Sequence, residues 1–247
     1  VFGDVQGTEV WKPLVYLSIA SGAGLAPNEA VSIGNIKCSC DNDSLEAMGL
    51  AARSFQGVSI ASVNTEGGIY GFKVGGETGD TALGVVAKGI RIGAAFCRNQ
   101  QSNGAPSLIA AANIYNPPGE QKVQGVSIGT FQCAGSRSYG WWMQNAEAHV
   151  DHMLLDGQHS TSIREQLRLL DASALSIGTL EFKAQRVSGM CKQEDGTSLT
   201  IGLARFHEQA VASLLGLSRS ASGVTTAKLH VEKIECVDAP TESGTSH

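Results

Sequence analysis

The residues best suited to chemistry gather in one stretch, "NAEAHVDHMLLDGQH", at positions 145–159. If this stretch is a helix, His149, His152 and Asp156 stand at i, i+3 and i+7 and share one face. Two imidazoles and a carboxylate are ligands that hold Zn or Fe and leave a position open for water. One hypothesis for this stretch is therefore a site for a divalent transition metal, with His159 just beyond the helix end.

Two interpretations of the stretch stay open. In the first, Glu147 or Asp151 supplies the base of a metal-dependent enzyme. In the second, the polar residues form a solvated helix face, because the chain contains neither an HExxH motif nor a CxxC pair. A G-x-S-x-G turn for a nucleophilic serine is also missing. No catalytic residue can be assigned. The absence of these motifs favours a protein that is not an enzyme, without deciding the question.

Two other short stretches have the composition of binding sites. The tandem Trp141 and Trp142 would stack on a sugar, anchor the core or contact another subunit, and we treat them as candidate contact aromatics. The glycine-rich "GGETGD" at 75–80 lacks the lysine and the spacing of a phosphate-binding loop, so it is interpreted as a turn.

Charge and hydropathy exclude some partners. The formal net charge is −5 and the 18 Lys and Arg residues are scattered, whereas phosphate neutralisation needs several convergent cations. We therefore do not expect nucleic acid as a primary partner. No apolar run approaches the ~20 residues that cross a bilayer, so no membrane span is expected.

The six cysteines bear on the setting of the protein. A chain of 247 residues can bury a core without a disulfide framework, so free, buried thiols are expected. They favour an intracellular location or a place within an assembled particle, although the sequence leaves the disulfide state undetermined. No resident cofactor is expected unless the histidine stretch holds its metal.

One eight-residue pattern, aliphatic-x-Ile-Gly-x-x-x-Cys/Phe, occurs five times. Its apolar residues change side: in the first copy Val31 and Ile33 share one face of a strand, whereas Ile36 and Cys38 lie on the other. Glycine permits the bend that such a change requires. The pattern predicts bent strands, as at the corners of barrels and of packed sheets, with the bends at Gly34, Gly93, Gly129, Gly178 and Gly202.

The spacing of these copies is irregular, at 59, 36, 49 and 24 residues. Because solenoids and propellers keep a fixed period, neither architecture is expected. We instead predict an α+β fold, with a predominantly antiparallel bent β-barrel or two-layer sheet. Apolar residues at helical spacing predict inserted helices near 44–54, 140–172 and 206–217.

The expected organisation is one β-rich domain over 1–237, with a helical insertion around 140–172 and a flexible tail at 238–247. The function favoured by these features is a non-enzymatic assembly subunit that self-associates into a capsid-like shell, a tube or a filament, as in a virion. The alternatives are the metal-dependent enzyme above and a barrel that binds a small apolar ligand in its mouth. The expected partners are other copies of the chain or other assembly subunits.

Overall fold

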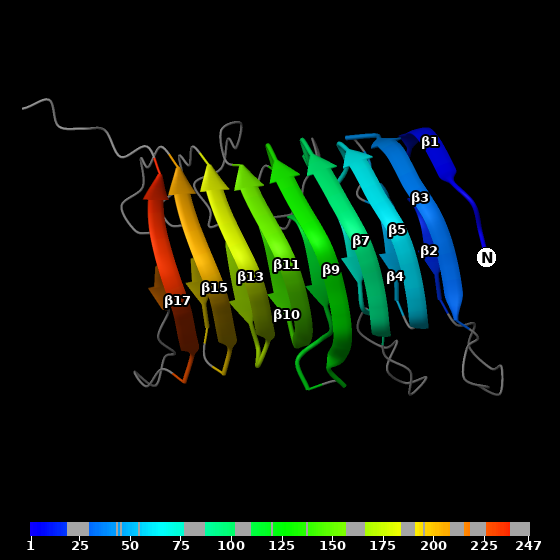
Figure 1. Cartoon of the computed structure of the whole chain (residues 1–247). Coiled ribbons are helices and arrows are strands. Elements are labelled where there is room, and N and C mark those ends of the chain that lie inside the picture. Colours follow the sequence, from blue (N-terminus) through cyan, green and yellow to red (C-terminus); the bar gives the residue numbers. More distant parts are fainter. Residues whose placement is uncertain are drawn as a thin grey trace, which may run out of the picture.

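Two layers of parallel strands make up the protein (Figure 1). All regular elements of the described residues are strands, and this part of the chain contains no helix. The computed structural model describes residues 1–18, 30–42, 44, 46–53, 55–76, 87–101, 110–119, 121–136, 138–156, 166–183, 191–194, 196–207, 215–217 and 226–237.

The odd-numbered strands form a nine-stranded sheet, which lies in front in Figure 1. Its order follows the chain, from β1 at one edge to β17 at the other. Its strands are β1 (Val5–Val10), β3 (Val31–Cys40), β5 (Gln56–Glu66), β7 (Lys88–Arg98), β9 (Val123–Ala134), β11 (Ala146–Asp156), β13 (Ala174–Lys183), β15 (Ser198–His207) and β17 (Lys228–Val237).

The even-numbered strands form an eight-stranded sheet behind the first. They are shorter, and they also follow one another in chain order. These strands are β2 (Pro13–Leu17), β4 (Met48–Ala52), β6 (Tyr70–Val74), β8 (Ala110–Tyr115), β10 (Tyr139–Gln144), β12 (Leu167–Leu170), β14 (Cys191–Gln193) and β16 (Leu215–Leu217).

The chain therefore winds as a solenoid, in which each coil adds one strand to each sheet. Parallel neighbours need a crossover, and here the strand of the opposite sheet provides it. The core lies between the two sheets. The ring centroid of Phe131 on β9 lies 6.1 Å from that of Phe72 on β6 and 5.2 Å from that of Trp141 on β10. A single buried cluster includes residues of both sheets along most of the solenoid.

Equivalent residues of successive coils stack in ladders. The central ladder of the nine-stranded sheet is formed by aliphatic residues in direct register, and each such side chain contributes roughly 1.5–3 kcal/mol when it is fully buried. Because the ladder side chains are similar in size and shape, coils of different length pack against one another in the same register. The ladder runs through Ile33, Ile60, Ile92, Ile128, Val150, Ile177, Ile201 and Val231.

The glycine of the repeated pattern follows the ladder residue in five of these strands. In β9, Ile128 and Phe131 are both buried, and the two residues between them, Gly129 and Thr130, both face outward and are half-buried. A Cβ atom on Gly129 would lie 2.6 Å from the carbonyl oxygen of Gly93 in the preceding coil. The backbones of the two coils thus approach closely at this glycine, and none of these five glycines has a positive φ.

The expected α+β fold with an antiparallel barrel is wrong, because both sheets are parallel throughout their described strands. The turn at Gly67 and Gly68, which resembles a hairpin in sequence, carries the chain from β5 in one sheet to β6 in the other. Positive φ angles of 75° at both glycines permit that change of direction. Strands on either side of a glycine turn need not pair with each other.

The expected helices near 44–54, 140–172 and 206–217 are also wrong where the structure describes them. Residues 48–52 form β4, the segment 140–172 contains β10, β11 and β12, and β15 continues to His207. Residues 157–165 and 208–214 lie outside the described residues. The bend explains the error. Two successive residues face outward at the bend of β11, so the buried residues on either side of it, Val150 and Met153, lie three positions apart. That spacing is also typical of a helix.

The expectation that the protein is not a solenoid was wrong, because two coils that lack the glycine were not counted. The long intervals of 59 and 49 residues each contain an extra coil, in which Ala61 or Asp151 takes the place of glycine. Coil length itself varies, from 22 residues between Ile128 and Val150 to 36 between Ile92 and Ile128. The connecting segments absorb this variation, so the strands stay in register.

The glycine ladder yields a test of stability. Gly129→Ala should destabilise the fold by about 1–3 kcal/mol, because its methyl group must displace a backbone carbonyl that has no rotamer to adopt. Gly3→Ala is the matched control, since a Cβ atom there meets nothing within 4 Å. Urea unfolding monitored by circular dichroism compares the two, and equal midpoints would show that the coils do not approach so closely.

Candidate functional site

The residues predicted to bind metal all lie on β11, but as a strand they do not converge. At about 3.3 Å per residue, His149 and Asp156 are separated by roughly 23 Å, whereas a helix would have placed them two turns apart on one face. Among the described residues, no group of three or more His, Cys, Asp or Glu side chains is placed to hold a metal ion. His159 lies outside the described residues.

Each residue of this stretch has its own neighbour instead. The Nε2 atom of His149 lies 2.9 Å from Asp151 Oδ1, and Glu147 pairs with Lys122 at 2.9 Å. His149 also borders a groove of about 330 Å³ that crosses β9, β11, β13 and β15. Asp151 stands at the bend position of its strand, where five other coils have glycine. One proposed base, Asp151, therefore pairs with the proposed ligand His149, whereas the other proposed base, Glu147, pairs with a lysine.

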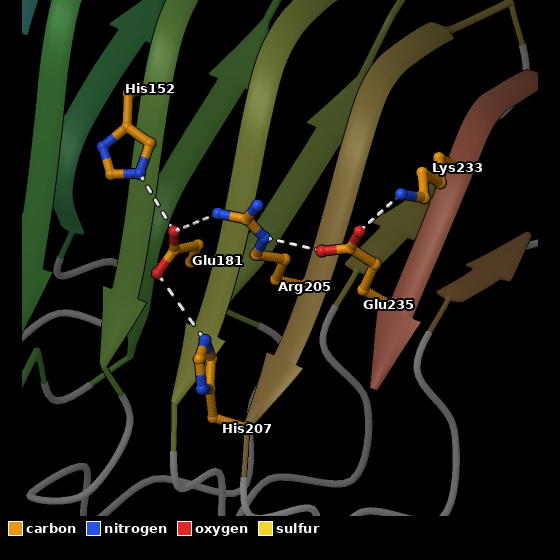
Figure 2. Close-up of polar contacts among 6 residues, drawn as sticks. All are labelled: His152, Glu181, Arg205, His207, Lys233 and Glu235. Carbon is orange, nitrogen blue, oxygen red and sulfur yellow. Dashed lines mark hydrogen bonds and ion pairs between the residues drawn. The ribbon is translucent and has the colours of Figure 1, made fainter. Parts of the chain in front are cut away.

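His152 belongs to a charged network on the outer face of the nine-stranded sheet, shown in Figure 2. The network joins four consecutive strands, β11, β13, β15 and β17. Its side chains alternate in charge across the strands, so each carboxylate lies between cationic or titratable nitrogen groups. The members are His152, Glu181, Arg205, His207, Lys233 and Glu235.

Glu181 is the centre of this network. Its Oε1 atom lies 3.4 Å from His152 Nε2 and 3.5 Å from Arg205 Nη1, and its Oε2 atom lies 3.6 Å from His207 Nε2. Partial burial acts to raise the pKa of Glu181, but the hydrogen bond and charge of His152, followed by the charge of His207 and the hydrogen bond from Arg205, hold it below its ordinary value. Glu181 is therefore ionised at neutral pH.

Glu235 is held ionised in the same way. Lys233 Nζ lies 2.6 Å from one carboxylate oxygen, and Arg205 Nε donates to the other at 2.8 Å. These two hydrogen bonds, Lys233 first, lower the pKa of Glu235 to about 2. A pair of catalytic carboxylates needs one that keeps its proton near neutral pH, and neither carboxylate here does so. The network fits charge compensation between coils better than acid–base catalysis.

A signal for this network was present in the sequence. Glu181 and Arg205 both occupy the seventh position of the repeated pattern, and Glu235 occupies the same position in the last strand. Aligning the copies as parallel, in-register strands places these three residues side by side. The antiparallel interpretation concealed that alignment.

The tandem tryptophans are buried within the chain. Trp141 is fully buried in the core, and Trp142, 7% exposed, packs against Tyr115 with ring centroids 5.5 Å apart. The cysteines are free thiols, five of them buried and Cys236 exposed. Burial raises the pKa of Cys97 to about 12, so its thiolate is not populated at neutral pH and it is a poor nucleophile.

Exposed apolar surface is concentrated at the two ends of the solenoid. Five large apolar side chains are exposed among the described residues, and all belong to the first or the last coil. Among the described strands, β17 has a neighbour on one side only. The five are Val1, Phe2, Trp11, Tyr16 and Ile234.

The network predicts a defined pH dependence. Because the folded pKa of Glu235, about 2, lies below its ordinary value of 4.5, its contribution to stability is complete above pH 4.5 and is lost as pH falls toward 2. Glu235→Gln should lower the urea midpoint at pH 7 and should match the unmodified chain near pH 2. Glu232→Gln, on the same strand, is the control. An unchanged difference between Glu235→Gln and the unmodified chain across that pH range would contradict the assignment.

Comparisons of the chain with protein-family models, with curated proteins and with solved structures found no match. Within the described residues there is also no helix of the length and apolar character needed to cross a membrane. The contacts, charges and exposed surfaces of the described residues are the observations that bear on function.

Proposed function

We propose that this protein is a structural subunit that self-associates head to tail through the two ends of its solenoid. The observation that carries the proposal is that the large apolar side chains exposed among the described residues all lie in the first and last coils. An open edge of a parallel sheet offers unpaired backbone N–H and C=O groups, which favours the addition of another strand. A repeat protein without capping repeats tends to associate at its ends for this reason.

The ladders specify how a second copy would fit. Within one chain, Phe2 bridges to Ile33 and Val5 pairs with Ile36, so the N-terminal strand already follows the ladder positions. If β1 of a second copy pairs with the free edge of β17, Phe2 lies beside Val231 and Val5 beside Ile234. Phe2 and Ile234, which are 61% and 54% exposed, would both become covered. The contact thus continues the core in its existing register.

Charge favours the same register. Asp4 precedes Val5 and lies at the ladder position of Asn35, whose backbone and side-chain nitrogen atoms both donate to it. Lys233 holds the equivalent position in β17. Head-to-tail pairing therefore brings a carboxylate opposite an ammonium group. At an exposed edge such a pair contributes about 0–1 kcal/mol, so it selects the register more than it adds affinity.

Head-to-tail contact between different surfaces repeats without closing when each copy follows the axis of the one before it. A straight solenoid whose coils follow one another along one axis meets that condition. Of the shell, tube and filament expected from the sequence, the proposal therefore selects a filament. The charged network over β11 to β17 supports it by tying the terminal strand to three others.

The first test is removal of the apolar end. Ile234→Lys should convert filaments of the full chain into monomers, because a charge at the ladder position of the core cannot be covered. Leu203→Lys is the matched control: it introduces the same side chain on the outer face of neighbouring β15 and should leave assembly intact. Negative-stain microscopy and sedimentation velocity report the outcome. Monomers of the unmodified chain at every concentration would refute the proposal.

The second test is reversal of charge. Lys233→Glu or Asp4→Lys alone should weaken assembly by placing like charges opposite each other, and mixing the two single variants should restore alternating contacts between them. Lys88→Glu, a reversal on an internal coil, should have no effect. If the mixture assembles no better than either variant alone, the proposed register is wrong even if filaments form.

A further inference from the structure

Two cysteines at the end of β3 have side chains in contact. Cys38 and Cys40 are both buried, and their Sγ atoms lie 3.4 Å apart, so one thiol donates a hydrogen bond to the other. Residues two apart on a strand have Cα atoms about 6.6 Å apart, just inside the limit of about 6.8 Å for a disulfide. The two thiols can therefore close into a disulfide, and a bond at this limit is readily reduced again.

The pair lies beneath one edge of the molecule. β3 is the second strand of the nine-stranded sheet, and β1 is the edge strand beside it (Figure 1). Cys38 pairs with Gly7 and Cys40 with Val10, and the register of β1 shifts between these two partners. Val10 and Leu14 of the first coil pack against the two thiols. An irregularly paired edge strand opens more easily than an internal strand, so the thiols become accessible through local opening of β1.

A groove on the outside of the same strands gives a small molecule a place to approach. It borders β1, β3 and β5 and has a volume of about 380 Å³, within the range of small-molecule sites. Gly7 and Cys38, which are paired with each other, both line it. The groove therefore lies at the part of β1 whose opening exposes the thiols.

The hydrogen bond makes the two thiols unequal. It lowers the pKa of Cys40, although burial acts in the opposite direction, and together with burial it raises the pKa of Cys38. Cys40 therefore loses its proton first, and the S–H group of Cys38 donates to the resulting thiolate. Because the thiolate is the nucleophile in disulfide exchange, Cys40 is the attacking residue and Cys38 is the resolving residue.

A second pair of cysteines provides a comparison within the same chain. Cys97 and Cys133 are in register on the neighbouring strands β7 and β9, so their Cα atoms lie about 4.8 Å apart, which is also within reach of a disulfide. Both are fully buried on internal strands, and burial raises the pKa of each thiol. This pair has the spacing but neither the edge position nor the thiolate.

We infer that Cys38 and Cys40 are a site of reversible oxidation, at which a low-molecular-weight disulfide such as oxidised glutathione converts the dithiol to a disulfide. The Cys40 thiolate attacks one sulfur of the oxidant, whose S–S bond breaks and releases one thiol. Cys38 then loses its proton and attacks the Cys40 sulfur of the mixed disulfide, which releases the second thiol. The two protons of the protein dithiol end on the two released thiols, and the oxidant is reduced by two electrons.

Mass spectrometry of the full chain tests the inference. The reduced protein is incubated with oxidised glutathione at mildly alkaline pH, alkylated with iodoacetamide and digested with trypsin. Cleavage after Lys37 and Arg53 releases the peptide 38–53, which contains both cysteines and no others. This peptide should be lighter by two hydrogens, should resist alkylation, and should regain both thiols after treatment with dithiothreitol. Cys236, which is exposed, should carry glutathione and so shows that the oxidant is active.

Two results would overturn the inference. One is a peptide 38–53 with both thiols free while Cys236 carries glutathione. The other is a disulfide between Cys97 and Cys133 that forms as fast as the one in peptide 38–53, because oxidation would then follow general unfolding of the chain. The site lies within one chain and does not depend on head-to-tail assembly. The Ile234→Lys variant should therefore form the same disulfide, whether or not the unmodified chain forms filaments.

Variants assign the roles of the two thiols. Cys38→Ser should stop the reaction at a mixed disulfide of Cys40 with glutathione, because no second thiol is present to resolve it. Cys38→Ala also removes the hydrogen-bond donor and should slow formation of that mixed disulfide roughly threefold, since a tenfold smaller thiolate fraction is partly offset by higher nucleophilicity. Cys133→Ser is the control and should leave oxidation of the pair unchanged. Equal rates for Cys38→Ala and Cys38→Ser, with folding verified by circular dichroism, would contradict the role of the hydrogen bond.

Discussion

The close approach of successive coils is the constraint on which this structure depends. At Gly93, Gly129, Gly178 and Gly202 a backbone carbonyl of the preceding coil occupies the space where a side chain would lie, as the carbonyl of Gly93 does for Gly129. Parallel strands in register can stack this closely only if every coil bends at the same place. The aliphatic ladder beside the bend then fills the space between the sheets. Repetition of one short pattern is therefore a requirement of packing, and it carries no chemistry of its own.

The sequence showed that the buried side changes at each repeated glycine, but it did not show the direction of the strands. A glycine between apolar residues that change side, as between Ile33 and Ile36, indicates a bend whatever the architecture. Strand direction is not encoded locally in this way, because the chain between two parallel neighbours passes through the other sheet. Ala61 and Asp151 hid two coils from a search for glycine, and variable connections hid the period. The bend also gave β11 apolar spacings of three, which are typical of helices.

The functional surfaces were less visible for the same reason. His149, His152 and Asp156 are near one another in sequence, but an extended strand separates them, so a local pattern suggested a site that strand geometry disperses. The charged network depends on register between strands that are distant along the chain. Glu181 meets Arg205 because both follow a bend glycine by the same number of residues. A correct alignment of the coils would have revealed these surfaces.

The solenoid register is tested most directly by one distance across the stack. Ser32 and His230 occupy the same outward ladder position on β3 and β17, seven strand steps apart. Spin labels at these positions, on a chain with Cys236 replaced by serine and diluted in unlabelled protein, should give a narrow distribution centred at about 34 Å from a strand spacing of about 4.8 Å. A distribution centred well below about 20 Å, as a closed barrel would produce, would contradict the parallel stack and with it the proposed assembly.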